Sequence, residues 1–554
     1  MAHPFFDKHK ATLDRALQAI AERGYWSPYP ESPSPRNYGE GAAEEGKALF
    51  DAMRDQPFDL DQPGMVGHVG KERSPYGFDL GIDYPKPDAD ALFAAIAKAQ
   101  ATWRKAGPEA WVGVSLEILD RINKASHVIA HAVMHTTGQA FMMAFQAGGP
   151  HAQDRGLEAV AYAWDEMRRI PAKAHWEKPQ GKSEPLRMEK HFRVVPRGIA
   201  LVIGVSTFPT WNGYPGLFAS LATGNAVVVK PHPGAILPLA VTVRIAREVL
   251  EDGGFDPNVV TLFAHDAGDE TAQKLALRPD VKLIDFTGSS ANGMWLERNA
   301  VQAQVYTEKA GVNQIVIDSA EDVKSVARNV AFSLSLYTGQ MCTAPQNIYV
   351  PHDGIETSNG RKSFDDVAAS LAEAVQKLLG DPARAVELLG AVQSEHTAKR
   401  IDAARALGPV LLDSQPIAHP HFPDATIRTP LIVRLNAADR DKYLIEWFGP
   451  IAFVIATEST SQSLDIARQA IKDHGALTLS VYSTNDDVID EAIDVAEDAG
   501  VALSINLTGG VFVNQSAAFS DFHGTGANPA ANAALTDAAF VASRFRVVQH
   551  RRHV

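Results

Sequence analysis

Cysteine is nearly absent from this sequence, since Cys342 is the single one in 554 residues. One thiol excludes an intrachain disulfide and a zinc site built from several cysteines, and it fits a reducing compartment. An excess of positive charge is missing too, because 52 lysines and arginines face 66 aspartates and glutamates, for a net charge of −14. We therefore expect no nucleic-acid partner, since neutralising phosphates takes clustered cations.

Long hydrophobic runs are also missing. The longest, such as IALVIGV at 199–205, fall far short of the roughly 20 residues of a membrane span. The N-terminus mixes charged and apolar residues, unlike a signal peptide. Hydrophobic residues make up 45% of the chain and charged residues 21%, as in ordinary globular proteins. We expect a soluble, cytoplasmic protein with no membrane partner.

The chain divides into segments of different pattern. Residues 1–85 are rich in Pro, Gly and Tyr and predict one or two short helices followed by an irregular N-terminal extension. Helical periodicity starts near residue 88, and strand-like runs such as FRVVPRGIALVIGV alternate with helices from about residue 188. This alternation predicts an α/β fold of two doubly wound units, about 86–307 and 308–515, before a C-terminal segment at 516–554.

A row of histidines and the basic C-terminal stretch can each be interpreted as a binding site or as a purely structural feature. His127, His131 and His135 lie four residues apart on one predicted helix, a spacing that could hold a metal ion. A packed or solvated helix face is the commoner meaning, so we predict no metal. The basic end RFRVVQHRRHV could bind an anion, but we interpret it as a terminal strand whose charged edge discourages aggregation.

A glycine-rich turn follows the predicted strand KLIDFT. Gly288 and Ser289 lead into a predicted helix that contains Gly293. Backbone N–H groups at a helix N-terminus favour phosphate, and the two glycines would let a pyrophosphate approach closely. The turn could also be glycine-rich for steric reasons alone, and it lacks the spacing of the GxGxxG fingerprint.

The single cysteine lies in the stretch LYTGQMCTAPQN, just after a helix predicted over 322–337. A lone cysteine is usually a small buried apolar residue. A turn between two elements would instead expose the Cys342 thiol as a nucleophile, provided that the site lowers its pKa.

Five motifs resemble, in their order, those of the aldehyde dehydrogenase superfamily: GNAVVVKP (224–231), FTGSSANG (286–293), TEKAG (307–311), GQMC (339–342) and EWFGP (446–450). Glu308 lies 34 residues before Cys342, which is the superfamily's spacing between its base and its nucleophile. The resemblance covers about residues 90–550. It implies a dinucleotide-binding domain at 86–307, a catalytic domain at 308–515 and a small β oligomerisation element.

The resemblance implies an NAD(P)-dependent oxidation of an aldehyde to a carboxylic acid. Cys342 would form a thiohemiacetal and then a thioester, and Glu308 would activate the hydrolytic water, for which a raised pKa is expected. The alternative for Glu308 is a salt bridge with its neighbour Lys309. The residues that match the superfamily's cofactor site are Lys230, Gly288, Ser289, Gly293, Glu446 and Phe448.

Two departures from the superfamily's motifs affect the expected site. Thr207 stands where an asparagine usually supplies the second oxyanion donor, so either its hydroxyl substitutes or Asn212 moves in. Pro233, beside His232, replaces the glutamate that grips the ribose 2′-hydroxyl and repels a 2′-phosphate. We therefore expect NADP to be accepted and preferred, with NAD possible.

The stretches STFPTWNGYP (206–215) and DFHGTGANPAANA (521–533) resemble the aldehyde dehydrogenases of bacterial aerobic phenylacetate degradation. That resemblance implies a ring-opened semialdehyde linked to CoA as the small-molecule substrate. Two alternatives remain: a CoA-acylating dehydrogenase, against which Glu308 argues, and a catalytically silent NAD(P)-binding scaffold, against which Cys342 argues as well.

The resemblance also implies an oligomer. Superfamily members pair subunits through a hairpin, here about 178–198, and a C-terminal strand, here about 533–551. We expect a homodimer or a dimer of dimers in which a neighbour completes the strand-like RFRVVQ.

Overall fold

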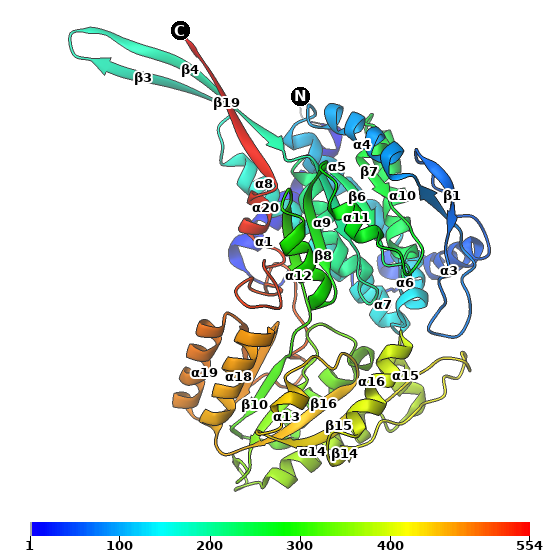
Figure 1. Ribbon diagram of the computed structural model, residues 1–554. Coiled ribbons are helices and arrows are strands. Elements are labelled where there is room, and N and C mark those ends of the chain that lie inside the picture. Colours follow the sequence, from blue (N-terminus) through cyan, green and yellow to red (C-terminus); the bar gives the residue numbers. More distant parts are fainter. Residues whose placement is uncertain (1–2) are drawn as a thin grey trace.

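The computed structural model describes residues 3–554 and contains two α/β bodies with an arm that projects from one of them (Figure 1). Among these residues, none of the helices combines the length and the apolar character that crossing a membrane requires. The chain starts with three helices and a two-stranded antiparallel sheet: α1 (Pro4–Glu22), α2 (Pro35–Tyr38), α3 (Ala42–Met53), β1 (Met65–Val69) and β2 (Tyr84–Pro87).

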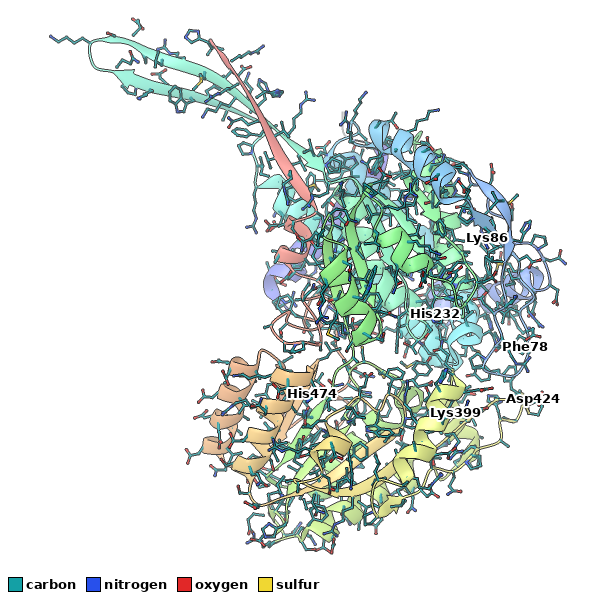
Figure 2. All side chains as sticks on the ribbon, viewed as in Figure 1. Phe78, Lys86, His232, Lys399, Asp424 and His474 are labelled. Atoms are coloured by element: carbon teal, nitrogen blue, oxygen red, sulfur yellow. The ribbon has the colours of Figure 1, made fainter. Side chains whose placement is uncertain are left out.

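This N-terminal extension touches both bodies. A Cβ on Gly77 would lie 2.4 Å from that of Asp424, so the extension meets a loop of the second body there, and Figure 2 shows Phe78 close to Asp424. Five helices follow: α4 (Ala89–Trp103), α5 (Pro108–Lys124), α6 (Ser126–Thr137), α7 (Phe141–Gly148) and α8 (Pro150–Arg168). α4 packs on one face of the first sheet, whereas α5 to α8 form an outer layer on the helices that cover the opposite face.

The first body has a five-stranded parallel sheet in the order β7-β6-β5-β8-β9. Its central strands are buried along their whole length, which is why they read as continuous apolar runs. The strands are β5 (Ile199–Ile203), β6 (Ala226–Lys230), β7 (Val260–Leu262), β8 (Val281–Thr287) and β9 (Gln304–Glu308). Between them lie α9 (Pro209–Ala222), α10 (Leu237–Asp252), η1 (Pro257–Val259), α11 (Thr271–Ala276) and α12 (Ser290–Asn299).

The second body has a seven-stranded sheet in the order β14-β15-β16-β12-β10-β17-β18, in which only β14 runs antiparallel. Its strands are β10 (Gln314–Ile317), β12 (Asn347–Pro351), β14 (Val410–Leu412), β15 (Leu431–Asn436), β16 (Ile451–Thr457), β17 (Thr478–Tyr482) and β18 (Ala502–Ile505). The pair β11 (Ser319–Ala320) and β13 (Glu356–Thr357) lies apart from it.

Helices alternate with these strands: α13 (Val323–Ser335), η2 (Leu336–Gly339), α14 (Phe364–Leu378), α15 (Pro382–Leu389), α16 (Glu395–Arg405), α17 (Arg440–Tyr443), α18 (Thr460–His474) and α19 (Asp486–Ala499). After β18 the chain returns to the first body, where α20 (Ala538–Ala542) packs against α8. The predicted fold class is thus confirmed: two doubly wound sheets built mainly of parallel strands and, in addition, a small antiparallel β element.

The arm is a three-stranded antiparallel sheet of β3 (Lys173–Gln180), β4 (Ser183–Pro196) and β19 (Phe545–His553). The strand predicted as one run over 192–205 is in fact two strands, because Pro196 ends β4 and Gly198 turns the chain at φ 144° into β5. The terminal strand β19 pairs with β4 of its own chain along all its residues. Its own chain therefore supplies this partner strand, and no neighbouring subunit is needed for it.

Candidate active site

Four strands of the first sheet end at one edge and place the first group of site residues. Lys230 ends β6, Thr207 lies in the turn after β5, Ser289 follows β8 and Glu308 ends β9. Thr287 of β8 is in register with Glu308. Because the carboxyl ends of parallel strands share an edge, residues far apart in the sequence meet there.

Cys342 comes from the second body and lies in the turn that follows η2. Tyr337 and Thr338 in η2 have φ of 51° and 52°, so the chain leaves the helical conformation before it reaches the thiol. A Cβ on Gly339 would lie 2.6 Å from the Gly449 carbonyl oxygen. This turn therefore packs directly on the loop of Glu446 and Phe448, which explains the glycine of the GQMC motif.

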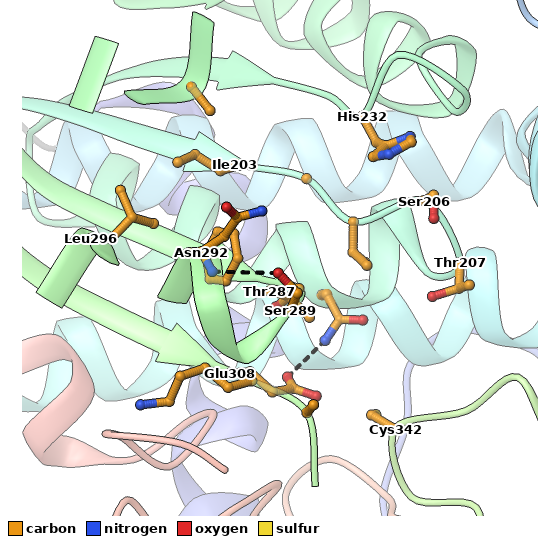
Figure 3. Close-up of a pocket in the computed structure, with 18 of the residues that line it drawn as sticks. Ile203, Ser206, Thr207, His232, Thr287, Ser289, Asn292, Leu296, Glu308 and Cys342 are labelled. Atoms are coloured by element: carbon orange, nitrogen blue, oxygen red, sulfur yellow. Dashed lines mark hydrogen bonds between the residues drawn. The ribbon is translucent and has the colours of Figure 1, made fainter. Parts of the chain in front are cut away.

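A first cavity of about 670 Å³ runs between the two bodies and brings nearly all the predicted site residues together. Its lining includes Cys342, Glu308, Thr207, Lys230, Gly288, Ser289, Glu446 and Phe448, several of which are labelled in Figure 3. Gly293 is not part of the lining. A Cβ there would lie 2.5 Å from Lys309 Cγ, so the glycine at this position lets α12 pack closely on Lys309.

Glu308 sits in a hydrogen-bonded cluster around the thiol. Asn212 Nδ2 donates to its Oε2 at 2.9 Å, and His523 Nε2 lies 3.1 Å from its Oε1 and 3.7 Å from Cys342 Sγ. The alternative salt bridge with Lys309 does not form, because Lys309 Nζ pairs with Glu297 at 2.7 Å. Ligand atoms of Glu308, Cys342 and His523 lie within 4.8 Å of one another, a spacing that a thiophilic cation could use.

The electrostatics of this cluster differ from the sequence-based expectation. Burial pushes the pKa of Glu308 up, but the His523 ring and the hydrogen-bond donors outweigh it, so that the pKa is lowered. The prediction of a raised pKa for the base is therefore wrong for this state. Burial and the nearby Glu308 carboxylate raise the pKa of the Cys342 thiol well above its usual range, which keeps the sulfur protonated until a base takes the proton.

The two candidate oxyanion donors lie in different settings. Both residues line the first cavity, but the Asn212 amide donates to Glu308, while the Thr207 carbonyl accepts a hydrogen bond of 2.9 Å from Gln139. Figure 3 shows Thr207 and Cys342 on the same side of the pocket.

The residues of the first cavity fit a dinucleotide. Lys230 is 5% exposed, and its Nζ makes only a long hydrogen bond of 3.5 Å to the Pro231 carbonyl, so the cation can serve a ligand. Burial lowers the pKa of Lys230 to about 8 and raises the pKa of Glu446 to about 7. Ser289 caps α12, whose N-terminal N–H groups lie beside the cavity and suit a phosphate.

A second cavity, also of about 670 Å³, reaches Cys342 and Phe208 from the other side. Its walls come from the N-terminal extension, from α7, α8, α9, α13 and α15, and from the C-terminal segment that carries His523. Six aromatic side chains contribute to its lining: Tyr25, Trp26, Phe208, Trp211, Phe332 and Phe512. Arg155 also lines it but is already paired with Glu158, at 2.9 Å.

The row of three histidines on α6 lies outside both cavities and packs against aromatic rings. His131 and His135 both stack on Phe50, with ring centroids 5.8 and 4.9 Å away. Burial lowers the pKa of His131 to about 4 and that of His135 to about 3, so these rings stay neutral.

Sequence reasoning missed His523 as a site residue. Its stretch was singled out for its unusual composition, but nothing in the spacing of 181 residues from Cys342 linked the two. It also missed Arg155, which is 1% exposed and whose guanidinium donates to the Asp521 carbonyl at 2.9 Å and so holds the segment of His523 on α8. No local pattern marks either residue.

Comparisons with known proteins agree with this geometry. The chain is 70% identical, over the full length of both chains and with a TM-score of 0.99, to a solved structure described as an NAD-dependent aldehyde dehydrogenase from Burkholderia multivorans. It is 25% identical to a 1-pyrroline-5-carboxylate dehydrogenase of Bacillus licheniformis, over 76% of this chain and 78% of that protein.

A 2-aminomuconic 6-semialdehyde dehydrogenase of a Pseudomonas species is 29% identical over 52% of this chain and 58% of its own length. The model of the aldehyde dehydrogenase family matches residues 83–527, a span that contains Cys342, Glu308 and every residue of the first cavity. From its motifs, its fold and this match, the chain belongs to the aldehyde dehydrogenase family.

Proposed function

We propose that this protein oxidises an aldehyde to a carboxylic acid with NAD as the acceptor. The observation that carries the proposal is the position of Cys342, which lines both the dinucleotide-compatible first cavity and the second cavity with its six aromatic side chains. An aldehyde entering through the second cavity would meet the thiol, with Glu308 beside it and the cofactor side opposite.

The protein's own groups support each step. Glu308 takes the Sγ proton of Cys342, and the thiolate attacks the carbonyl carbon to give a thiohemiacetal whose oxyanion accepts hydrogen bonds from the Cys342 backbone N–H and, we propose, the Thr207 hydroxyl. A bound nicotinamide supplies the acceptor for the hydride that leaves this carbon. Glu308 releases the first proton to solvent and then removes a proton from water, whose oxygen attacks the thioester. The leaving Cys342 thiolate takes up that proton from Glu308 as the acid is released.

Lys230, Ser289, Glu446 and Phe448 are the proposed cofactor contacts. NAD is proposed because the 70% identical structure is described as NAD-dependent. Acceptance of NADP remains a prediction from Pro233, which offers no carboxylate to repel a 2′-phosphate. Pro233→Glu is expected to lower kcat/KM for NADP relative to NAD, and an unchanged ratio would show that Pro233 does not set the preference.

We further propose an aldehyde of the phenylacetate pathway, of the PaaN type, as the substrate: a ring-opened semialdehyde linked to CoA. The two stretches at 206–215 and 521–533 support this choice. The second cavity adds one constraint. Glu31, Glu387 and Asp521 line it, whereas Arg155 is already paired, so a CoA chain would have to leave its phosphates outside this lining.

The test is the appearance of reduced cofactor at 340 nm with NAD or NADP and a panel of aldehydes that includes a CoA-linked one. Turnover that disappears in Cys342→Ala supports the dehydrogenase, and a carboxylic acid product excludes acyl transfer to CoA. Tight nucleotide binding without turnover of any aldehyde would favour the silent scaffold instead.

We also propose that the arm of β3, β4 and β19 pairs two subunits. Val547 and Val548 on β19 are 41% and 54% exposed, and such apolar side chains on an open sheet suit a partner surface. Sedimentation velocity should show a dimer or a dimer of dimers, and deletion of 545–554 should yield monomers.

A further inference from the structure

His523 is the one ring that bridges the two proposed catalytic groups. Its Nε2 lies 3.1 Å from Glu308 Oε1 and 3.7 Å from Cys342 Sγ. The side chains of His523 and Glu308 are each 3% exposed. The carboxylate can only accept a hydrogen bond, so Nε2 carries the hydrogen and donates it.

The ring is held in place from several directions. His523 pairs through its backbone with Leu535, with its N–H donating at 3.1 Å and its carbonyl accepting at 3.0 Å. The Trp211 ring meets it edge-on, with centroids 4.6 Å apart. Arg155 holds the adjoining Asp521 carbonyl. A ring fixed in this way can present its N–H at the moment of reaction without first being ordered.

The thiol needs such a donor. It faces the carboxylates of Glu308 and, farther off, Glu446, and both oppose the formation of a negative sulfur. Arg155 lies over the Trp211 ring at 5.4 Å and is already paired with Glu158. The His523 N–H is therefore the side-chain donor that stands beside the sulfur, 3.7 Å away, where the thiolate charge develops.

We propose that His523 is a catalytic residue that transfers its hydrogen bond from the Glu308 carboxylate to the Cys342 thiolate as the thiol is activated. The Sγ proton moves to the Glu308 carboxylate, which becomes a neutral acid and a poorer acceptor. The Nε2–H then donates mainly to the sulfur, which lies 3.7 Å from the same nitrogen, and His523 neither gains nor loses a proton. The proposal rests on the proposed function of Cys342 as the nucleophile.

The test measures thiol activation without aldehyde or cofactor. Because Cys342 is the only cysteine, the rate of iodoacetamide incorporation reports on this sulfur alone, in EDTA to keep metal ions away. His523→Phe is expected to slow alkylation at pH 7 by about tenfold and to move its pH midpoint upward, as expected for loss of a donor to the charged form. His523→Gln, which keeps an N–H near the Nε2 position, should restore most of the rate.

The matched control is His396→Phe, since His396 is exposed and lies outside both cavities. It should alkylate like the wild type. Equal rates and equal pH midpoints for His523→Phe and the wild type would overturn the proposal, and so would a His523→Gln variant as slow as His523→Phe. If His523→Phe does not fold by circular dichroism, His523→Leu takes its place. None of these readouts depends on the dehydrogenase assay.

A second, independent observation concerns the N-terminal extension. Tyr25, Trp26 and Glu31 line the second cavity together with Cys342, so a segment that precedes the family match at residue 83 forms part of the wall beside the thiol. Trp26 packs edge-on against Phe519, with centroids 5.2 Å apart.

This wall is tied to α8. Ser27 Oγ donates to Asp154 Oδ1 at 2.9 Å, and His151 Nε2 pairs with Glu31 at 3.0 Å. Arg23 donates to the Tyr162 hydroxyl at 2.9 Å. Burial raises the pKa of Asp154 well above its usual range, which favours the neutral form of this carboxyl.

We infer that Trp26 is a specificity-determining residue that selects aldehydes with an extended apolar body. This inference rests on the proposed function. Trp26→Ala is expected to raise KM for octanal by about fivefold, as expected for loss of a large apolar contact, and to leave KM for acetaldehyde and kcat unchanged. Tyr38→Phe, in the same extension but outside the cavity lining, is the matched control.

A binding measurement separates this inference from the proposed function. Octanamide, which cannot be oxidised in this way, should protect Cys342 from iodoacetamide, and Trp26→Ala should raise the half-protecting concentration by the same factor. Equal protection in both proteins would overturn the inference even if both oxidise octanal. Weaker protection of Trp26→Ala than of the wild type, together with no turnover by either protein, would count against the proposed function alone.

Discussion

The two cavities that meet at Cys342 are built in different ways. The first is lined mainly by turns at the carboxyl ends of strands in one sheet, together with two loops of the second body. The second is lined by the N-terminal extension, helices of both bodies and the C-terminal segment. One is a property of a regular sheet edge, and the other exists only because remote segments pack together.

This difference decides which residues a sequence can reveal. Strand ends recur at a fixed place relative to buried apolar runs, so Lys230, Ser289 and Glu308 stand in recognisable motifs. Trp26 and His523 stand in irregular segments whose neighbours are set by tertiary packing. The first cavity is therefore where sequence-based prediction succeeds, and the second is where it fails.

The largest effect is expected from Glu308→Gln, which changes the carboxylate beside Cys342, where the two cavities meet. The amide cannot accept the Cys342 proton or activate water, so steady-state turnover should fall by roughly 10²–10⁴-fold, the usual contribution of a general base. Rapid mixing at 340 nm should show that the first turnover of reduced cofactor is slowed as well, because the thiol has lost its base. Unchanged turnover would remove Glu308 from the mechanism.

Arg155 tests the second cavity's dependence on tertiary packing. Its guanidinium pairs with Glu158, and the two side chains are 1% and 0% exposed. Arg155→Met leaves a buried carboxylate without this partner, so the free energy of unfolding should fall by about 3–5 kcal/mol. Urea unfolding measures it.

The matched control for that variant is Arg168→Met on the same helix. The Arg168 side chain is 50% exposed and pairs with Asp165, and such exposed pairs contribute about 0–1 kcal/mol. Equal losses in the two variants would show that the buried pair does not anchor the C-terminal segment to α8.

Variants of Thr207 test whether a residue of the first cavity supplies the second oxyanion donor. Thr207→Val keeps the shape and removes the hydroxyl, so the rate of hydride transfer should fall on the order of 10²-fold if the hydroxyl is an oxyanion donor. Thr207→Asn restores a donor and should equal or exceed the wild type. Single-turnover rates at 340 nm measure the hydride transfer. An unchanged rate in Thr207→Val would assign the role of second oxyanion donor to Asn212.

Lys230 provides the smallest expected effect. Burial lowers its pKa to about 8, so Lys230 is charged below that pH and neutral above it. The kcat/KM for NAD should fall as the pH rises through about 8. Lys230→Met should lose roughly tenfold at pH 7, as for a lost hydrogen bond from a charged group, and should show no such pH dependence. A parallel decline in both proteins would assign the pH effect to another group.

The sequence predicted the site through particular residues. The spacing of Glu308 and Cys342 and the motif around Glu446 located the first cavity, and eight of the nine candidate site residues line it. Gly293 does not, because its place one turn into α12 serves packing against Lys309. The lowered pKa of Glu308 could not be predicted, since it depends on His523, which lies 215 residues further along the chain.

The sequence by itself determined the alternation of buried strands and helices, because apolar runs and their breaks are local properties of the chain. It also determined which side chains stand at the strand ends. Only the tertiary structure decided that the two ends of the chain close the second cavity around Cys342. Hydrogen bonds such as those of Arg155 and Ser27 form between surfaces that meet only after the sheets and helices have packed, so no spacing along the chain encodes them.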